Sequence, residues 1–105
     1  MRIYVVEYTY DTKLNSLTQD FRPAHRRFLR DLYAKDVLLS SGWLRDAMHE
    51  GALIILKAES ANVALKILED DPFSVQGFII DRRIMQWEPT IGSLAEEFDT
   101  KFPYS

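Results

Sequence analysis

The order in which strand-like and helix-like patterns follow one another restricts the fold of this 105-residue chain more than any other feature. Four segments rich in β-branched and aromatic residues predict strands. They span residues 3–10, 37–41, 52–57 and 78–87. Two segments between them carry apolar residues at helical spacing, one over 22–35 and one that begins after Ser60. The order β-α-β-β-α-β is that of ferredoxin-like α+β folds, so we expect a four-stranded antiparallel sheet with two helices on one face.

The boundaries of the helices follow from capping residues and prolines. Residues 11–20 are polar and predict a loop, in which Asp20 would cap a helix that runs from Arg22 to Lys35. Pro23 suits the first turn of such a helix, where its missing N–H is no loss. Pro72 ends the second helix, because the residue before a proline is disfavoured in the helical region.

The two faces of the predicted sheet are both apolar. Alternation along the first strand puts Ile3 and Val5 on one face and Tyr4, Val6, Tyr8 and Tyr10 on the other. Leu53 and Ile55 alternate in the same way along the third strand. Two helices cover one face only, and a monomer rarely exposes a large apolar patch. We therefore expect a homodimer through the sheet face, while a face covered by the tail and loops is the alternative.

Charge and composition exclude several classes of protein. Thirteen basic against sixteen acidic residues give a net charge of −3 without a basic run, which speaks against nucleic-acid binding. The chain has no cysteine, and its two histidines and scattered acids show no metal-ligand spacing, so we expect no metal. No nucleotide-binding glycine motif occurs, and we expect no cofactor. No apolar run reaches ~20 residues and no signal-peptide pattern opens the chain, so we expect a cytoplasmic protein without membrane contact.

His25 is the first candidate for a chemical role. It follows Phe21 by four residues and precedes Phe28 and Leu29 by three and four, which puts it on the sheet-facing side of the first helix. Burial and the positive end of a helix that begins at Arg22 both favour the neutral imidazole, the form that acts as a general base. A core histidine bonded to a backbone carbonyl is the alternative.

Asp70 and Asp71 are the second candidates. They stand at the end of the second helix, where acids oppose the helix dipole, and residues 73–77 after them predict a short connector. One carboxylate could pair with His25, although 46 residues separate Asp71 from it. An Asp-Pro turn, in which the carboxylate caps its own loop, is the alternative.

Two further residues leave their roles open. Gly42 either lets the backbone approach a ligand closely or bends the second strand, which Trp43 and Leu44 then continue. His49 stands in a predicted turn, where we expect it to be solvated. Residues 93–98 predict one or two turns of terminal helix.

Three short motifs give the chain a resemblance to a known family. They are Arg22-Pro23-Ala24-His25, Leu38-Leu39-Ser40-Ser41-Gly42 and Asp71-Pro72-Phe73. Together, and in this order, they resemble the YCII-related (YciI-like) family. The resemblance implies a ferredoxin-like domain over residues 1–89 that forms a dimeric α/β barrel, with residues 90–105 as a C-terminal extension.

The resemblance also implies a site. It assigns His25 and Asp71 as an acid–base pair, with a pocket lined by the residues that the motifs share with the family. These are Arg22, Ser41, Gly42 and Phe73. Two positions depart from the family pattern. Asp36 replaces a helix-ending glycine, which suggests a different exit from the helix, and Trp43 replaces a proline, which puts a bulky ring beside the pocket.

Two kinds of function fit these features. The first is a cofactor-independent enzyme, an isomerase, a lyase such as a dehydrochlorinase, or a hydrolase, that acts on a small cyclic or aromatic compound. There His25 would move a proton, Asp71 would fix its tautomer and Arg22 would hold an anionic oxygen. The second is a non-catalytic dimer that binds a small ligand or serves as an accessory subunit. A purely structural role of the pair predicts no pocket between the two residues.

Overall fold

The computed structural model describes residues 1–97 of the chain as one antiparallel sheet with helices on one side. The strands are β1 (Arg2–Tyr10), β2 (Leu38–Arg45), β3 (Glu50–Ala58) and β4 (Ile79–Gln86). Their order in the sheet is β2-β3-β1-β4, with β2 and β3 joined as a hairpin. This is the ferredoxin-like α+β arrangement that the order of sequence patterns predicts.

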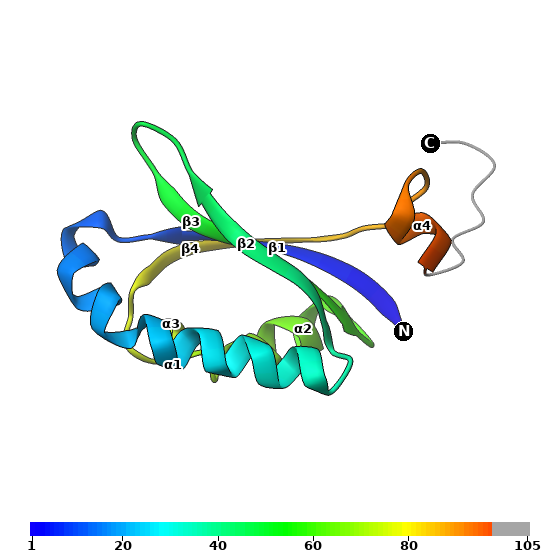
Figure 1. The fold of residues 1–105 in the computed structure, drawn as a ribbon, viewed down its shortest axis with the longest axis horizontal. Coiled ribbons are helices and arrows are strands. Elements are labelled where there is room, and N and C mark those ends of the chain that lie inside the picture. Colours follow the sequence, from blue (N-terminus) through cyan, green and yellow to red (C-terminus); the bar gives the residue numbers. More distant parts are fainter. Residues whose placement is uncertain (98–105) are drawn as a thin grey trace.

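Two longer helices and three short helical segments complete the described chain. The longer ones are α1 (Asn15–Ala34) and α2 (Ala61–Leu68). The short ones are η1 (Thr12–Leu14), α3 (Pro72–Val75) and α4 (Ser93–Glu97). The first three α-helices lie on the same face of the sheet, whereas α4 lies beyond its end (Figure 1). Phe98, the expected end of the terminal helix, lies outside the described residues. No helix in residues 1–97 combines the length and the apolarity that a membrane span needs.

The first helix starts earlier than its sequence pattern predicts. It begins at Asn15, so most of the expected loop over 11–20 is helical and Asp20 is not its cap. The cause is packing: Thr18 is buried and donates to the Asn15 carbonyl oxygen at 2.7 Å, and Leu14 before the helix also packs on the core. Because Thr18 counts as polar in a sequence pattern, the pattern does not predict that the buried side of the helix extends to residue 18.

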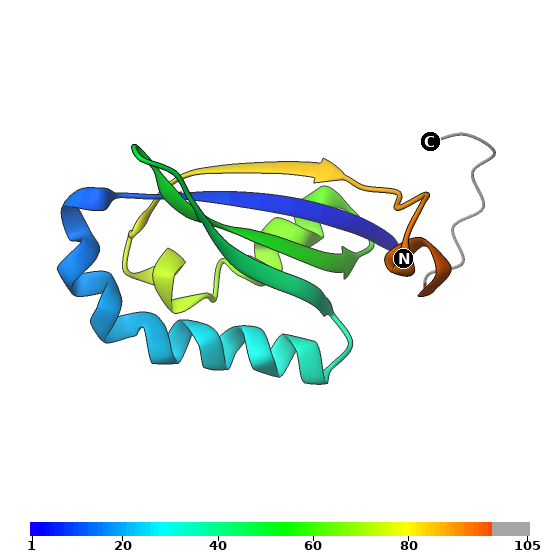
Figure 2. The same cartoon turned by 45° about the horizontal axis from the view of Figure 1, so that its top comes forward.

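Pro23 therefore lies inside α1, eight residues after Asn15, and not in its first turn. A proline there removes one helical hydrogen bond and crowds the carbonyl of the preceding turn, which bends a helix. The first turns of α1, in blue, run at an angle to the rest of the helix (Figure 2).

The end of α1 also differs from the expectation that Asp36 gives the chain a different exit from the helix. Asp36 has φ 62°, the left-handed conformation that usually calls for glycine. The Val37 N–H donates to the Leu32 carbonyl oxygen at 2.9 Å, which closes the last turn in the way typical of a glycine-terminated helix. Replacing glycine by aspartate thus leaves the path of the chain as it is. The Asp36 carboxylate accepts from Lys57 Nζ at 2.7 Å.

The burial of the sheet residues follows the predicted alternation. Tyr4, Val6, Tyr8 and Tyr10 of β1 are buried beneath the helices, with Ile54 of β3 among them. The face without helices, here called the open face, carries the other residues of each strand. Its apolar members in the register of the strands are Ile3, Val5, Leu44, Leu53, Ile55 and Met85.

The link between α2 and β4 also differs from its prediction. Ser60 caps α2 as expected, accepting from the Val63 N–H at 3.2 Å. The helix ends at Leu68, and the predicted connector contains the short helix α3. Asp71 is the N-cap of α3, so its carboxylate stands at a helix start, where negative charge is favourable.

Candidate active site

His25 and Asp71 meet beneath the sheet, where the middle of α1 faces the start of α3. The His25 Nδ1 atom lies 2.8 Å from one Asp71 carboxylate oxygen, Oδ1, and 3.0 Å from the other, Oδ2. The two side chains are 9% and 0% exposed. Two residues that are 46 positions apart in the chain thus form a buried, hydrogen-bonded pair.

The Asp71 carboxylate is held by two further donors. The Phe73 N–H donates to Oδ1 at 2.9 Å, as expected for a residue that caps α3. The Tyr8 hydroxyl of β1 donates to Oδ2 at 3.3 Å. A buried carboxylate with several donors has one orientation, and it passes that orientation on to the imidazole.

Phe73 supports the imidazole from behind. Its ring stacks on the His25 ring with centroids 4.0 Å apart and planes 3° apart, and it is fully buried. Tyr10 and Phe78 pack edge-on against Phe73. The sequence motif places Phe73 on the pocket wall, whereas the structure puts it behind the histidine, out of reach of a molecule in the cavity.

Two tyrosines of β1, Tyr8 and Tyr10, stay protonated in this environment. Burial raises the pKa of Tyr8 above its ordinary value, and the charge of Asp71 adds to the rise. Burial likewise raises the pKa of Tyr10, again with a contribution from Asp71. The Tyr8 hydroxyl is therefore a neutral hydrogen-bond donor to the carboxylate at all ordinary pH values.

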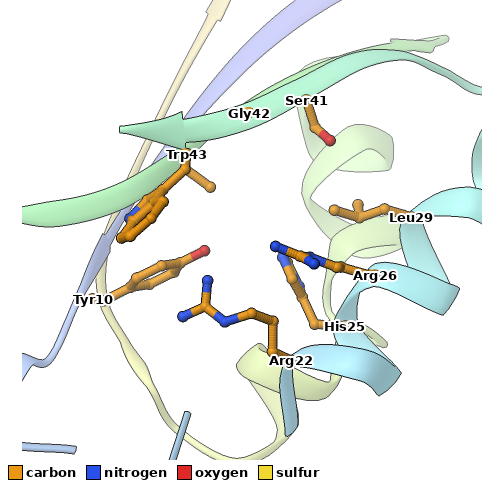
Figure 3. A pocket seen from close by; sticks show the side chains of 9 residues that line it. Tyr10, Arg22, His25, Arg26, Leu29, Ser41, Gly42 and Trp43 are labelled. Carbon is orange, nitrogen blue, oxygen red and sulfur yellow. The ribbon is translucent and has the colours of Figure 1, made fainter. Parts of the chain in front are cut away.

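A cavity of about 220 Å³ opens on the other side of the imidazole (Figure 3). One wall is α1, which contributes Arg22, His25, Arg26 and Leu29. The opposite wall is β2, which contributes Ser41, Gly42 and Trp43. Tyr10 and Ala52 complete the lining from the central strands. Arg22, Ser41 and Gly42, which the motifs single out, all border this space.

The side of the imidazole away from Asp71 lines this cavity. Nδ1 is engaged by Asp71, whereas Nε2 has no hydrogen-bond partner in residues 1–97 and is not sealed from solvent. His25 lies ten residues after the start of α1, so the positive helix end that the sequence pattern suggested is not near it. The orientation of the ring instead comes from the carboxylate and from the stacked Phe73.

Arginines dominate the charge of the cavity. Arg22 and Arg26 project into it from successive turns of α1 (Figure 3). The Arg22 guanidinium lies 5.6 Å from the centre of the Trp43 ring, and that of Arg45 lies 4.5 Å from it. Residues 1–97 contain no cluster of three His, Cys, Asp or Glu side chains that could hold a metal ion.

Sequence reasoning missed three members of this site: Tyr8, Tyr10 and Arg26. The alternation of β1 places both tyrosines on the helix-covered face, which is a usable signal, but it does not reveal that Tyr8 bonds Asp71. Arg26 follows Arg22 by one helical turn, and this spacing was the available hint.

Gly42 and His49 have simpler surroundings. Gly42 lies in the continuous strand β2, paired with Leu53, and a Cβ built on it would meet nothing within 4 Å. Its missing side chain answers no steric need within residues 1–97. His49 stands at the tip of the β2–β3 hairpin, where it is exposed as expected.

The fold and the site define a class of protein: a small ferredoxin-like domain with a buried His–Asp pair beside a cationic cavity. The family model of the YCII-related domain matches residues 1–88, and the chain belongs to this family. One solved structure with a similar fold is 5-chloro-2-hydroxyhydroquinone dehydrochlorinase from Burkholderia phenoliruptrix AC1100, in complex with 2,5-dihydroxybenzoquinone. It matches with a TM-score of 0.71 and 21% sequence identity, over 81% of this chain and 92% of that one. A search of curated proteins finds no relative.

Proposed function

We propose that the protein is a cofactor-independent acid–base enzyme that acts on a small cyclic or aromatic compound. One observation carries the proposal: a buried carboxylate holds Nδ1 of His25 while Nε2 faces a cavity. In the tautomer whose Nδ1–H donates to Asp71, Nε2 has a free lone pair. This is the arrangement of a general base with an orienting carboxylate.

The proposed chemistry is a proton transfer at Nε2. His25 takes a proton from a carbon or hydroxyl of the bound ring, and Asp71 stabilises the imidazolium that forms. Return of the proton to another atom of the ring gives isomerisation. Loss of a leaving group with its bonding electrons gives elimination, after which the proton passes to water. Attack by a water that His25 deprotonates gives hydrolysis.

The remaining residues receive positioning roles in this proposal. Arg22 holds an anionic oxygen, and the Ser41 hydroxyl and the backbone of Gly42 border the ring. The size of the cavity, about 220 Å³, suits one substituted ring. The dehydrochlorinase neighbour, solved with 2,5-dihydroxybenzoquinone, supports a small ring compound as the ligand.

The test is a matched pair of histidine variants, assayed against a panel of halogenated, hydroxylated and lactone ring compounds. We expect His25→Ala to keep the fold, by circular dichroism, and to lower turnover by about 100-fold or more. His49→Ala makes the same change at the exposed hairpin tip and should leave turnover unchanged. Full activity of His25→Ala would contradict the assignment, and ligand binding without any turnover would favour the non-catalytic alternative.

We also propose that the protein is a homodimer through the open face. The helices α1, α2 and α3 lie on the opposite face, and Met85 on the open face is 51% exposed, although Ile55 on the same face is buried. Leu53→Lys in the middle of the face should convert the dimer to a monomer in light scattering. Val63→Lys on α2 introduces the same charge away from the sheet and should leave the dimer intact. A monomeric parent protein would refute this proposal.

A further inference from the structure

The charge in the cavity beside His25 is of one sign. Arg22 and Arg26 both reach into it, no carboxylate residue is among its lining residues, and Asp71 lies fully buried behind the imidazole. Neither guanidinium forms an ion pair with an acid of residues 1–97. Two cations that share a small space repel each other, so an anion between them is favoured.

The two arginines differ in what holds them. Arg22 lies against the Trp43 ring, at 5.6 Å from its centre. The Arg26 guanidinium has no hydrogen bond, ion pair or ring contact within the described part of the chain. A guanidinium donates up to five hydrogen bonds in a fixed fork that matches a carboxylate, and those of Arg26 are all available.

Trp43 offers the cavity a flat apolar surface. It is 52% exposed, although it lies on the helix-covered side of β2. The residue paired with it on β3 is Ala52, whose small side chain leaves room in front of the indole. An aromatic ring seeks such a face for offset stacking, and the neighbouring guanidiniums strengthen the contact.

We propose that the site takes a planar single-ring compound that carries an anionic group, with Arg22 and Arg26 on the anion and Trp43 against the ring. The reacting atom of the ring then lies toward Nε2 of His25. This inference rests on the proposed function and names its class of substrate. Arg26 and Trp43 stand as the residues that set specificity, Arg26 for charge and Trp43 for planarity.

The size of the cavity limits the class further. About 220 Å³ is less than the roughly 300–1,000 Å³ of sites for drug-sized ligands. A second ring or a long acyl chain exceeds it. The anionic group is therefore attached directly to the ring or through a short link, as in an aromatic carboxylic acid or an ionised phenol.

Calorimetric titration of the full chain with two matched probes tests the inference. The probes are 2,5-dihydroxybenzoate and 2,5-dihydroxybenzamide, which have nearly the same shape and differ by one negative charge. We expect the benzoate to bind about tenfold more tightly or better, because charge-assisted hydrogen bonds are the strong ones. Equal affinities, or no heat of binding with the benzoate, would overturn the proposal.

Three variants test which residues cause the preference for the anionic probe. Arg26→Gln should lower the affinity ratio of the two probes several-fold, while Arg22 remains to hold the anion. Arg27→Gln removes the same charge from the same helix, but Arg27 does not border the cavity, so the ratio should persist. Trp43→Ala should weaken the binding of both probes, because both lose the contact between their ring and the indole. An unchanged ratio in Arg26→Gln, or an equal loss in Arg27→Gln, would count against the assignment.

The same titrations separate this inference from the proposed function. If His25→Gln keeps the charge preference and also keeps turnover, the general-base role fails while the anion site stands. If turnover depends on His25 but neutral ring compounds react as well as anionic ones, the anion site fails while the general-base role stands.

Discussion

Two aspartates of this molecule each lie beside Nδ1 of a histidine, one beneath the sheet and one at the tip of the β2–β3 hairpin. In the buried pair, His25 and Asp71, the atoms are 2.8 Å apart. In the hairpin pair, His49 and Asp46, they are 3.4 Å apart, and the side chains are 71% and 67% exposed. The chemical groups are identical, so any difference in behaviour comes from their surroundings.

The surroundings give the two aspartates different tasks. Asp46 accepts from the N–H groups of Met48 and His49, both at 2.7 Å, which is a local turn that a short peptide can form. Asp71 instead joins α1, α3 and β1 through His25, Phe73 and Tyr8. Only the folded protein brings those donors together around one carboxylate.

Removal of the two carboxylates should separate the pairs most clearly. Asp71→Ala leaves the buried donors of Tyr8 and Phe73 unsatisfied, and we expect the free energy of unfolding to fall by about 3 to 5 kcal/mol. Asp46→Ala should leave the midpoint of urea unfolding unchanged, because the carboxylate is exposed. Equal effects in the two variants would show that burial does not distinguish the pairs.

Alkaline pH should lower the free energy of unfolding through the tyrosines around the buried pair, and it should leave the hairpin pair unaffected. Tyr8 and Tyr10 keep their protons in the folded state, where burial raises the pKa, but release them when unfolded. Below about pH 10 both states are protonated and stability is constant in this respect; above it, each such tyrosine costs about 1.4 kcal/mol per pH unit. Urea unfolding from about pH 8 to about pH 11 measures the slope. Tyr8→Phe should reduce that slope, and an unchanged slope would remove Tyr8 as its cause.

The hydrogen bond from Tyr8 to Asp71 has a smaller expected effect at neutral pH. Tyr8→Phe keeps the ring and removes the donor at 3.3 Å, and we expect a loss of about 1 to 2 kcal/mol in the free energy of unfolding. Tyr4→Phe is the matched control on the same face of β1, where no hydrogen bond from the hydroxyl occurs in residues 1–97. A loss of similar size in Tyr4→Phe would assign the effect to the hydroxyl in general.

A third aspartate, Asp36, has no histidine partner, and its variants show the effect of backbone strain by itself. Asp36 has a left-handed backbone and an exposed ion pair with Lys57. Asp36→Gly loses the pair and relieves the strain, two effects of opposite sign and about 1 kcal/mol each, so stability should change little. Asp36→Ala keeps the strained Cβ and loses the pair, and it should be less stable than the glycine variant by about 1 kcal/mol in thermal unfolding.

Acid pH should open the turn at the hairpin tip, and of all these changes it should have the smallest effect on the stability of the whole protein. The backbone N–H groups of Met48 and His49 lower the pKa of Asp46 below its ordinary value. Its contribution is present above the ordinary range of an aspartate and is lost as pH falls through the lowered pKa. The amide resonances of Met48 and His49 should shift with that midpoint in NMR, without global unfolding. A midpoint in the ordinary range would mean that the turn is not formed in solution.

The sheet was predictable because its signal is local. Alternation along β1 sorts Tyr4, Val6 and Tyr8 to the covered face, and tertiary packing then follows the same division. The start of α1 was not predictable, because Thr18 is buried only through packing with other elements. The helix α3 was not predicted for a related reason: its four residues, which begin at the proline of the Asp71-Pro72 pair, are too few to show a helical period.

The His25–Asp71 contact was open to sequence reasoning only through the family motifs. Spacing does not place two residues together when 46 positions separate them, and the residue that joins them from β1, Tyr8, belongs to no motif. What the patterns do provide is the face: His25 on the inner side of a helix, and the tyrosines on the inner side of a strand.

The proline within α1 interrupts the hydrogen bonding of the helix that forms one wall of the cavity. Pro23 stands between Arg22 and His25, at the point where the helix lacks one internal hydrogen bond. The turns before it can unwind without the turns after it, because cooperativity along a helix depends on an unbroken ladder. Amide exchange should then divide α1 into a fast-exchanging segment with Arg22 and a slow one with His25 and Arg26. Within one helix, a segment that opens readily would then adjoin a segment that holds the His25 imidazole against Asp71.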